Sequence, residues 1–320
     1  MIKFKRTELA ELDDLAYQAM DRGALAEASL HFERLLQAKP EASHYHYMRG
    51  LAHKYLTDWP TSLQHNLRAI ALSRKTDQAQ HWNAAIAATA LADWEQARRL
   101  WAACGVKMDE GTDPIDGDFG VAVVRLNPWD GGETVFMRRI DPARARLLNV
   151  PLPESGHRFG DIVLHDGAPT GTRFNGDQDV PVFNQLQRLA PSEFRTFVVF
   201  VSCDSAGDLQ VLLDATAPGI GYAEDWTDSV RYYCLRCSYG APHRHNTDAA
   251  ADWQSGRNLG IAAQAVPPWK SCSKTGRPQI TAGTSKASKR VNARFLNGSM
   301  ATSGGVGRRM ESDDRYRQLS

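Results

Sequence analysis

The sequence predicts a multidomain protein with an N-terminal all-α helical array, an α+β domain with a mixed sheet, and a disordered basic C-terminal tail. Three observations lead to this prediction. A spacing of 34 and 35 residues recurs within residues 8–106, which is typical of helical repeats. Residues 118–262 change to short alternating segments separated by turns. Residues 267–320 contain few large apolar side chains.

Small and aromatic residues carry the repeat in the first third of the chain. Three sets of positions keep the same phase, with successive members 34 and 35 residues apart. The sets are Ala16, Gly50 and Ala85; Ala28, Ser62 and Ala97; and Phe32, Asn66 and Trp101. Small side chains at fixed positions let paired helices approach closely, and stacked units bury an apolar face that one pair cannot bury alone.

This pattern resembles the tetratricopeptide repeat (TPR) family, in three units over about residues 8–106. The resemblance implies two antiparallel helices per unit and a curved array with a concave face. Two positions depart from the family's pattern. Asn66 stands where an aromatic residue is usual, and only the first unit ends in a proline, Pro40.

By phase with the family, the first helix of each unit lines the concave face, which implies a groove for a protein or peptide partner. The predicted groove residues are Asp13, Tyr17, Met20, His44, Tyr47, Leu51, Lys54, Trp82 and Ile86. An alternative interpretation is that Tyr47, Trp82 and Ile86 pack against the following domain or each other. The family's carboxylate clamp has Lys and Asn in the first unit, where this chain has Asp13 and Tyr17, so clamp-type capture of a chaperone C-terminus is not expected.

The middle of the chain predicts strands joined mostly by turns and short loops. Residues 119–126 and 194–201 are expected as strands, and 194–201 is apolar enough to be central. Residues 160–167 are expected as a further strand that ends in a turn. Short helices are expected at 141–148 and 184–189. The sequence contains no Gly-rich phosphate loop, dinucleotide fingerprint or Gly-x-Ser-x-Gly turn, so it assigns no catalytic residue.

One cluster has residue types and spacing suited to a metal. Its members are Cys234, Cys237, His243 and His245. Two thiolates and one or two imidazoles suit tetrahedral zinc, although the intervals are shorter than in zinc fingers. Cys203 or His165 could complete such a site, and reduced thiols with exposed histidines are the alternative. Cys203, His165 and Asp166 could also form a Cys/His/Asp set, with an inert buried thiol as the alternative.

The charge is divided unevenly along the chain. Residues 267–320 hold 11 Lys/Arg and 3 Asp/Glu, whereas the preceding residues hold 27 and 34. A basic segment with so little apolar surface is expected to be disordered. Either it is solvated without a partner, or it binds nucleic acid or another anionic surface.

These observations favour a protein–protein interaction protein that docks a partner on its helical array, with an α+β domain of unknown activity. The alternative is a small zinc-dependent enzyme that uses the 234–245 cluster, with the repeats as a docking arm. Five cysteines in 320 residues, no signal-peptide pattern and no long apolar run predict a cytoplasmic protein that is not embedded in a membrane.

Overall fold

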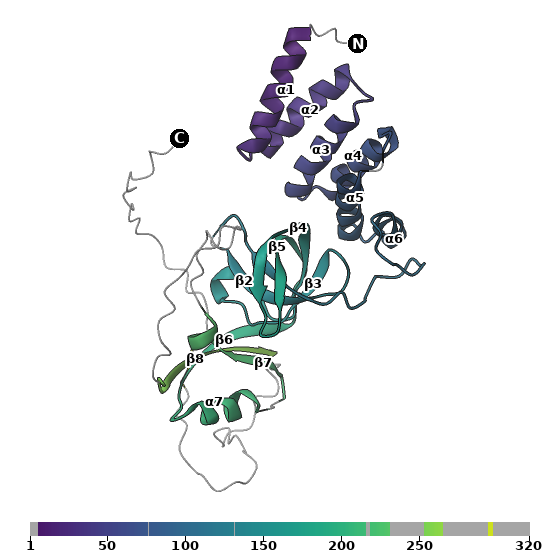
Figure 1. Cartoon of the computed structure of the whole chain (residues 1–320). Coiled ribbons are helices and arrows are strands. Elements are labelled where there is room, and N and C mark those ends of the chain that lie inside the picture. Colours follow the sequence, from purple (N-terminus) through teal and green to yellow (C-terminus); the bar gives the residue numbers. More distant parts are fainter. Residues whose placement is uncertain are drawn as a thin grey trace, which may run out of the picture.

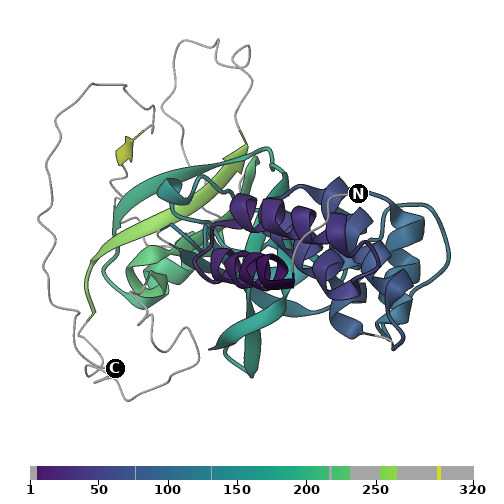
Figure 2. The ribbon, with the colours of Figure 1, turned by 90° about the horizontal axis from the view of Figure 1, so that it is seen from above.

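The computed structural model describes residues 6–75, 77–130, 132–215, 218–230, 253–264 and 294–296. These residues form a helical array, a closed five-stranded barrel and a four-stranded sheet. Figure 1 shows the array above the barrel and the second sheet below it, and Figure 2 shows from above that the helices lie over the barrel and extend to one side. The predicted order, a helical array followed by mixed α+β structure, is confirmed.

Six helices make up the array, and each packs against the next along the chain. They are α1 (Arg6–Asp21), α2 (Leu25–Ala38), α3 (Ser43–Tyr55), α4 (Trp59–Leu72), α5 (Gln78–Ala90) and α6 (Trp94–Ala103). Among the helices that the structure describes, none has both the length and the apolar character needed to cross a bilayer.

All nine residues that carry the repeat are buried, which explains their spacing. In the second unit Asn66 stands at the position of an aromatic ring, and hydrogen bonds among polar groups take the place of aromatic packing there. The Ser62 hydroxyl donates to the Gly50 carbonyl at 2.9 Å, and Asn66 Nδ2 donates to the Ser62 carbonyl at 2.8 Å. A Cβ on Gly50 would lie 2.6 Å from Asn66 Nδ2, so a glycine is needed where α3 and α4 meet.

The turn between the two helices of each unit has the same left-handed backbone in all three units. It falls on Gly23 (φ 75°), Thr57 (φ 58°) and Ala92 (φ 57°). The residues that follow the latter two, Asp58 and Asp93, cap the next helix through the backbone N–H groups three positions later. The repeat therefore imposes a conformation that only the first unit meets with a glycine.

The barrel has strands β1 (Val121–Leu126), β2 (Glu133–Arg139), β3 (Arg144–Leu147), β4 (Ile162–Phe174) and β5 (Asp179–Ala190). Successive strands pair antiparallel, and β5 closes the barrel by pairing parallel with β1. The parallel closure makes the sheet mixed. Alternate side chains of the strands fill the interior, among them Val124, Met137, Leu147, Val163 and Phe183.

Two local expectations are wrong. The helix expected at 141–148 is a turn followed by β3, because the Asp141 carboxylate accepts the backbone N–H groups of Ala143 and Arg144 at 2.8 and 2.5 Å. The helix expected at 184–189 belongs to β5, where pairing with both β4 and β1 overrides the local pattern.

The second sheet has the strand order β7-β8-β6-β9. Its strands are β6 (Phe194–Ser202), β7 (Ile220–Asp225), β8 (Gly256–Gln264) and β9 (Arg294–Leu296), with helices α7 (Ala206–Leu213) and α8 (Trp226–Ser229). The predicted central strand is confirmed as β6, which pairs with both β8 and β9. Apart from β9, the predicted tail at 267–320 lies outside the described residues.

The loop after β3 attaches the second sheet to the barrel. It includes the short 3-10 helix η1 (Pro153–Ser155). Glu224 of β7 accepts from Asn149 Nδ2 at 2.8 Å and from Trp226 Nε1 at 3.0 Å. Glu133 of β2 accepts the Leu152 backbone N–H at 3.1 Å. Two acidic side chains, one from the barrel and one from the second sheet, thus accept hydrogen bonds from one loop, and burial raises the pKa of both carboxyl groups.

Replacing the strained alanine of the third turn should stabilise the chain. Ala92→Gly removes the steric cost of a left-handed alanine and should raise the free energy of unfolding by up to about 1 kcal/mol. Urea denaturation measures this. Ala10→Gly, at an exposed position within α1, is the control and should lower it by about 1 kcal/mol. Destabilisation by Ala92→Gly would contradict the strain.

Stability should fall as the pH rises towards neutrality because of Glu133. Burial raises the pKa of Glu133 to about 7 from an ordinary 4.5, so the folded chain keeps a proton that the unfolded chain releases. The contribution of Glu133 is complete below about pH 4.5 and is lost as the pH rises through 7, a loss on the order of 2–3 kcal/mol. Glu133→Gln should flatten that decline in urea denaturation from pH 4.5 to 8, and the exposed control Glu193→Gln should not.

Candidate partner-binding site

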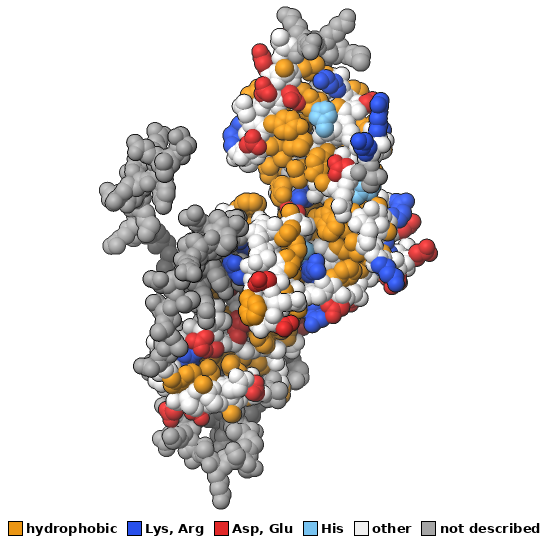
Figure 3. Space-filling view, in the orientation of Figure 1, with side chains coloured by type: hydrophobic (Ala, Val, Ile, Leu, Met, Phe, Trp, Pro, Cys, Tyr) orange, Lys and Arg blue, Asp and Glu red, His pale blue; other side chains and the backbone are white. Residues whose placement is uncertain are grey.

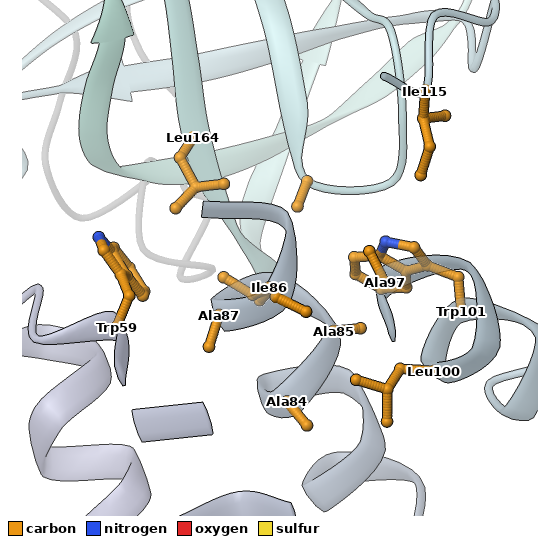
Figure 4. Close-up of a cluster of buried hydrophobic side chains, with 12 residues drawn as sticks. Trp59, Ala84, Ala85, Ile86, Ala87, Ala97, Leu100, Trp101, Ile115 and Leu164 are labelled. Atoms are coloured by element: carbon orange, nitrogen blue, oxygen red, sulfur yellow. The ribbon is translucent and has the colours of Figure 1, made fainter. Parts of the chain in front are cut away.

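The array and the barrel share one hydrophobic core. Leu164 of β4 packs with Ile86 and Ala87 of α5, with Trp59 and Trp101 in the same cluster. Figure 4 shows Leu164 reaching from the barrel towards Ile86, with Trp59 on one side and Trp101 on the other. Because the contact is apolar and fully buried, β4 of the barrel and the last repeats form one packed unit.

A buried ion pair crosses the same junction. Lys54 of α3 is 3% exposed, and its Nζ lies 2.9 Å from Asp166 Oδ1 of β4. Lys54 Nζ also donates to Asn83 Oδ1 at 3.1 Å, while Asp166 accepts from the Tyr55 hydroxyl at 2.9 Å and from the Gly167 backbone N–H at 2.7 Å. Burial lowers the pKa of Lys54, and the Asp166 carboxylate opposes that shift. Burial opposes ionisation of Asp166, but the nearby Lys54 ammonium holds the pKa of that carboxyl below its usual value.

Gly167 of β4 leaves room for the indole ring of Trp82 from α5 at this junction. A Cβ on Gly167 would overlap the Trp82 side chain, so only glycine fits at that point of β4. Asp166 and Gly167 were expected as a turn after a strand; instead β4 continues to Phe174, and its pairing with β5 shifts register between Leu164 and Gly171. The irregular segment brings the β4 backbone against the helices.

A pocket with a volume of about 420 Å³ lies beside the ion pair. Helices α3 and α5 and strand β4 line it, with Tyr47, Lys54, Tyr55, Trp82, Asn83 and Gly167 among the lining residues. Burial raises the pKa of Tyr47, and the nearby Asp77 carboxylate adds to that shift. The walls combine three aromatic rings with amide groups, which suits a polypeptide segment better than a small anion.

The nine predicted groove residues fall into two groups. Lys54 and Ile86 are buried by the chain itself, and Trp82 packs against both Trp101 and Gly167. The remaining six are at least partly exposed on α1 and α3: Asp13, Tyr17, Met20, His44, Tyr47 and Leu51. The barrel thus covers one end of the predicted groove. Figure 3 shows hydrophobic side chains gathered on one face of the array down to its junction with the barrel.

The sequence singled out Asp166 only for a Cys/His/Asp set and not as the partner of Lys54, and it gave no role to Gly167, Tyr55 or Asn83. Asp166 and Gly167 have the composition of an ordinary turn, and their neighbours in the array are more than 70 positions away in the chain. Nothing local indicated that pairing. Tyr55 directly follows Lys54, a predicted groove residue, and this adjacency is the one signal in the sequence that could have pointed to Tyr55.

The predicted metal residues Cys234, Cys237, His243 and His245 lie outside the described residues, so zinc binding there stays a prediction. Within the part of the chain that the structure describes, no group of three or more His, Cys, Asp or Glu side chains could hold a metal ion.

The Cys203, His165 and Asp166 set is not assembled. Cys203 packs under α7 with Leu209, whereas His165 is fully buried in β4, next to the ring of Phe183. Burial lowers the pKa of His165 to about 4, so it is a neutral side chain of the barrel wall.

No family model and no curated protein sequence matches the chain. Solved structures similar to it include a CopN–Scc3 complex (19% identity, TM-score 0.30, 32% of this chain and 59% of that one). Others are the TPR2B domain of yeast Sti1 in its pHsp70 complex (16%, 0.28, 30% and 76%), and a mutant O-GlcNAc transferase of Thermobaculum terrenum (20%, 0.29, 32% and 20%). The chain thus spans 59% of the CopN–Scc3 chain that it matches. The TPR-like character of the first third is visible in the array itself, in its three helix pairs with buried repeat positions.

Removing the cation of the buried pair should destabilise the whole chain. Lys54→Met leaves the Asp166 carboxylate buried without its positive partner, which should lower the free energy of unfolding by about 3–5 kcal/mol. Adding Asp166→Asn should recover part of that loss, since the buried charge is then gone. Lys107→Met, at an exposed position, is the matched control and should stay within about 0.5 kcal/mol of the parent in urea denaturation. An unchanged Lys54→Met variant would show that the pair does not hold the junction.

Proposed function

We propose that the chain is a docking protein that binds a polypeptide partner on the concave face of its TPR-like array. The observation that carries this proposal is a pocket walled by Tyr47, Tyr55 and Trp82, together with predicted groove residues on α1 and α3 that stay at least partly exposed. Aromatic rings provide large contact areas with little loss of conformational entropy, which is why they dominate binding surfaces.

The junction with the barrel supports the same proposal. The buried pair and the shared core fix the spacing between α3 and β4, so the pocket is formed before a partner arrives. A preformed site avoids the cost of ordering its walls during binding. Zinc binding by residues 234–245 stays a separate proposal from the sequence, which the metal content of the purified protein would test.

Loss of Tyr47 should weaken peptide binding without unfolding the array. The probe is a display library of random twelve-residue peptides selected on the immobilised full chain, followed by titration of an enriched synthetic peptide. Tyr47→Ala should raise its Kd at least about tenfold, mainly through faster dissociation, because the variant loses an aromatic wall of the pocket.

Leu30→Ala is the control, since Leu30 is 61% exposed on α2 and lines neither the pocket nor the predicted groove. Its Kd should equal that of the parent, and circular dichroism should show both variants folded. A library that yields no binding peptide, or a peptide that binds Tyr47→Ala as tightly as the parent, contradicts the proposal.

A further inference from the structure

A second hollow lies at the end of the barrel, next to the pocket between α3, α5 and β4. Its volume is about 460 Å³, and its walls include Trp129, His157 and Arg188. Tyr55 lines both this hollow and the pocket that contains Tyr47 and Trp82. The two pockets therefore adjoin at one tyrosine.

The wall of this barrel-end hollow is held by a chain of hydrogen bonds. The Asn127 backbone N–H donates to Gln185 Oε1 at 3.1 Å, which turns the amide nitrogen of Gln185 towards His157 Nε2, 2.6 Å away. His157 Nε2 is thus an acceptor, and its proton sits on Nδ1, which donates to the Ser155 carbonyl at 2.9 Å. Burial lowers the pKa of His157, which favours the neutral ring that these hydrogen bonds require.

The hollow's charge and its exposed apolar surface come from two other side chains. Arg188 is 40% exposed and uses one of its N–H groups on the Gly156 carbonyl, at 2.6 Å. Its guanidinium lies 3.5 Å from Asp161, whose own carboxylate accepts the backbone N–H groups of Arg158 and Ser192. Trp129 is 78% exposed on the rim. A guanidinium with further donors beside an open indole suits a carboxylate next to an apolar side chain.

Few charged side chains lie along the two pockets. At the array end, exposed Asp77 precedes α5 and acts on Tyr47, and Asp13 belongs to the predicted groove. At the barrel end Arg188 lines the hollow, with the buried Asp161 carboxylate 3.5 Å from its guanidinium. Lys54, between them, is neutralised by Asp166. Because Arg188 is 40% exposed whereas Lys54 is buried, Arg188 is the positively charged lining residue of these two pockets that is open to an acidic residue of a docked segment.

We propose that a polypeptide docked on the array continues past Tyr55 onto the barrel, where Arg188 pairs with an acidic side chain of the partner and Trp129 covers an adjacent apolar one. This inference rests on the proposed docking function and adds a second contact surface outside the repeats. The barrel would then read the partner's sequence, while the array supplies the first contact.

The test uses the full chain and an enriched library peptide that contains Asp or Glu. Trp129→Ala and Arg188→Gln should each raise the peptide Kd about tenfold. The controls are Phe174→Ala, at a barrel side chain that is 64% exposed, and Arg34→Gln, at an exposed position on α2; both should bind as the parent does. Replacing the peptide's acidic residue by its amide should also cost about tenfold, but should cost nothing further in Arg188→Gln, because the pair is then already broken.

The outcomes separate this inference from the docking function. If Tyr47→Ala weakens binding while Trp129→Ala and Arg188→Gln bind as the parent does, the array docks a partner and the barrel contact is refuted. Additive losses for Arg188→Gln and the amide peptide would refute the direct pairing. If no variant affects binding, both proposals fail.

Discussion

The buried ion pair between Lys54 and Asp166 holds the helical array and the barrel in one fixed arrangement. It joins the third helix of the array to strand β4 of the barrel, and the pair has further polar neighbours in Asn83, Tyr55 and the Gly167 backbone. An ion pair away from water is favourable only when its remaining hydrogen bonds are satisfied. The apolar core around Leu164 and Ile86 encloses the same junction, so the array and barrel form a single packed unit.

That junction limits how much of the array's surface is open to the proposed partner. In an isolated array the groove would extend over all three units, whereas here β4 occupies the end formed by α5. The predicted groove residues that stay at least partly exposed there lie on α1 and α3, and Tyr55 lines both the pocket beside α3 and the hollow at the barrel. A partner that follows this path touches two kinds of structure, curved helices and a barrel end, whose relative position is set before binding.

The repeats could be predicted from the sequence because their constraint is local and recurrent. Ala28, Ser62 and Ala97 must be small wherever two helices cross, and a fixed unit length reproduces that need at fixed spacing. The position of Asn66 was predicted too, but its hydrogen bonds with Ser62, and the contact that requires Gly50, depend on the packed pair.

The sequence by itself determined the helical array, the change to strands near residue 118 and the central strand at 194–201. Tertiary structure alone decided that β5 closes a barrel, that 141–148 and 184–189 are not helices, and that Asp166 and Gly167 meet α3 and α5. The physical reason is range. Helix periodicity depends on residues that are close together in the sequence. Strand pairing and the burial of a charge depend on partners far along the chain, and no local pattern identifies those partners.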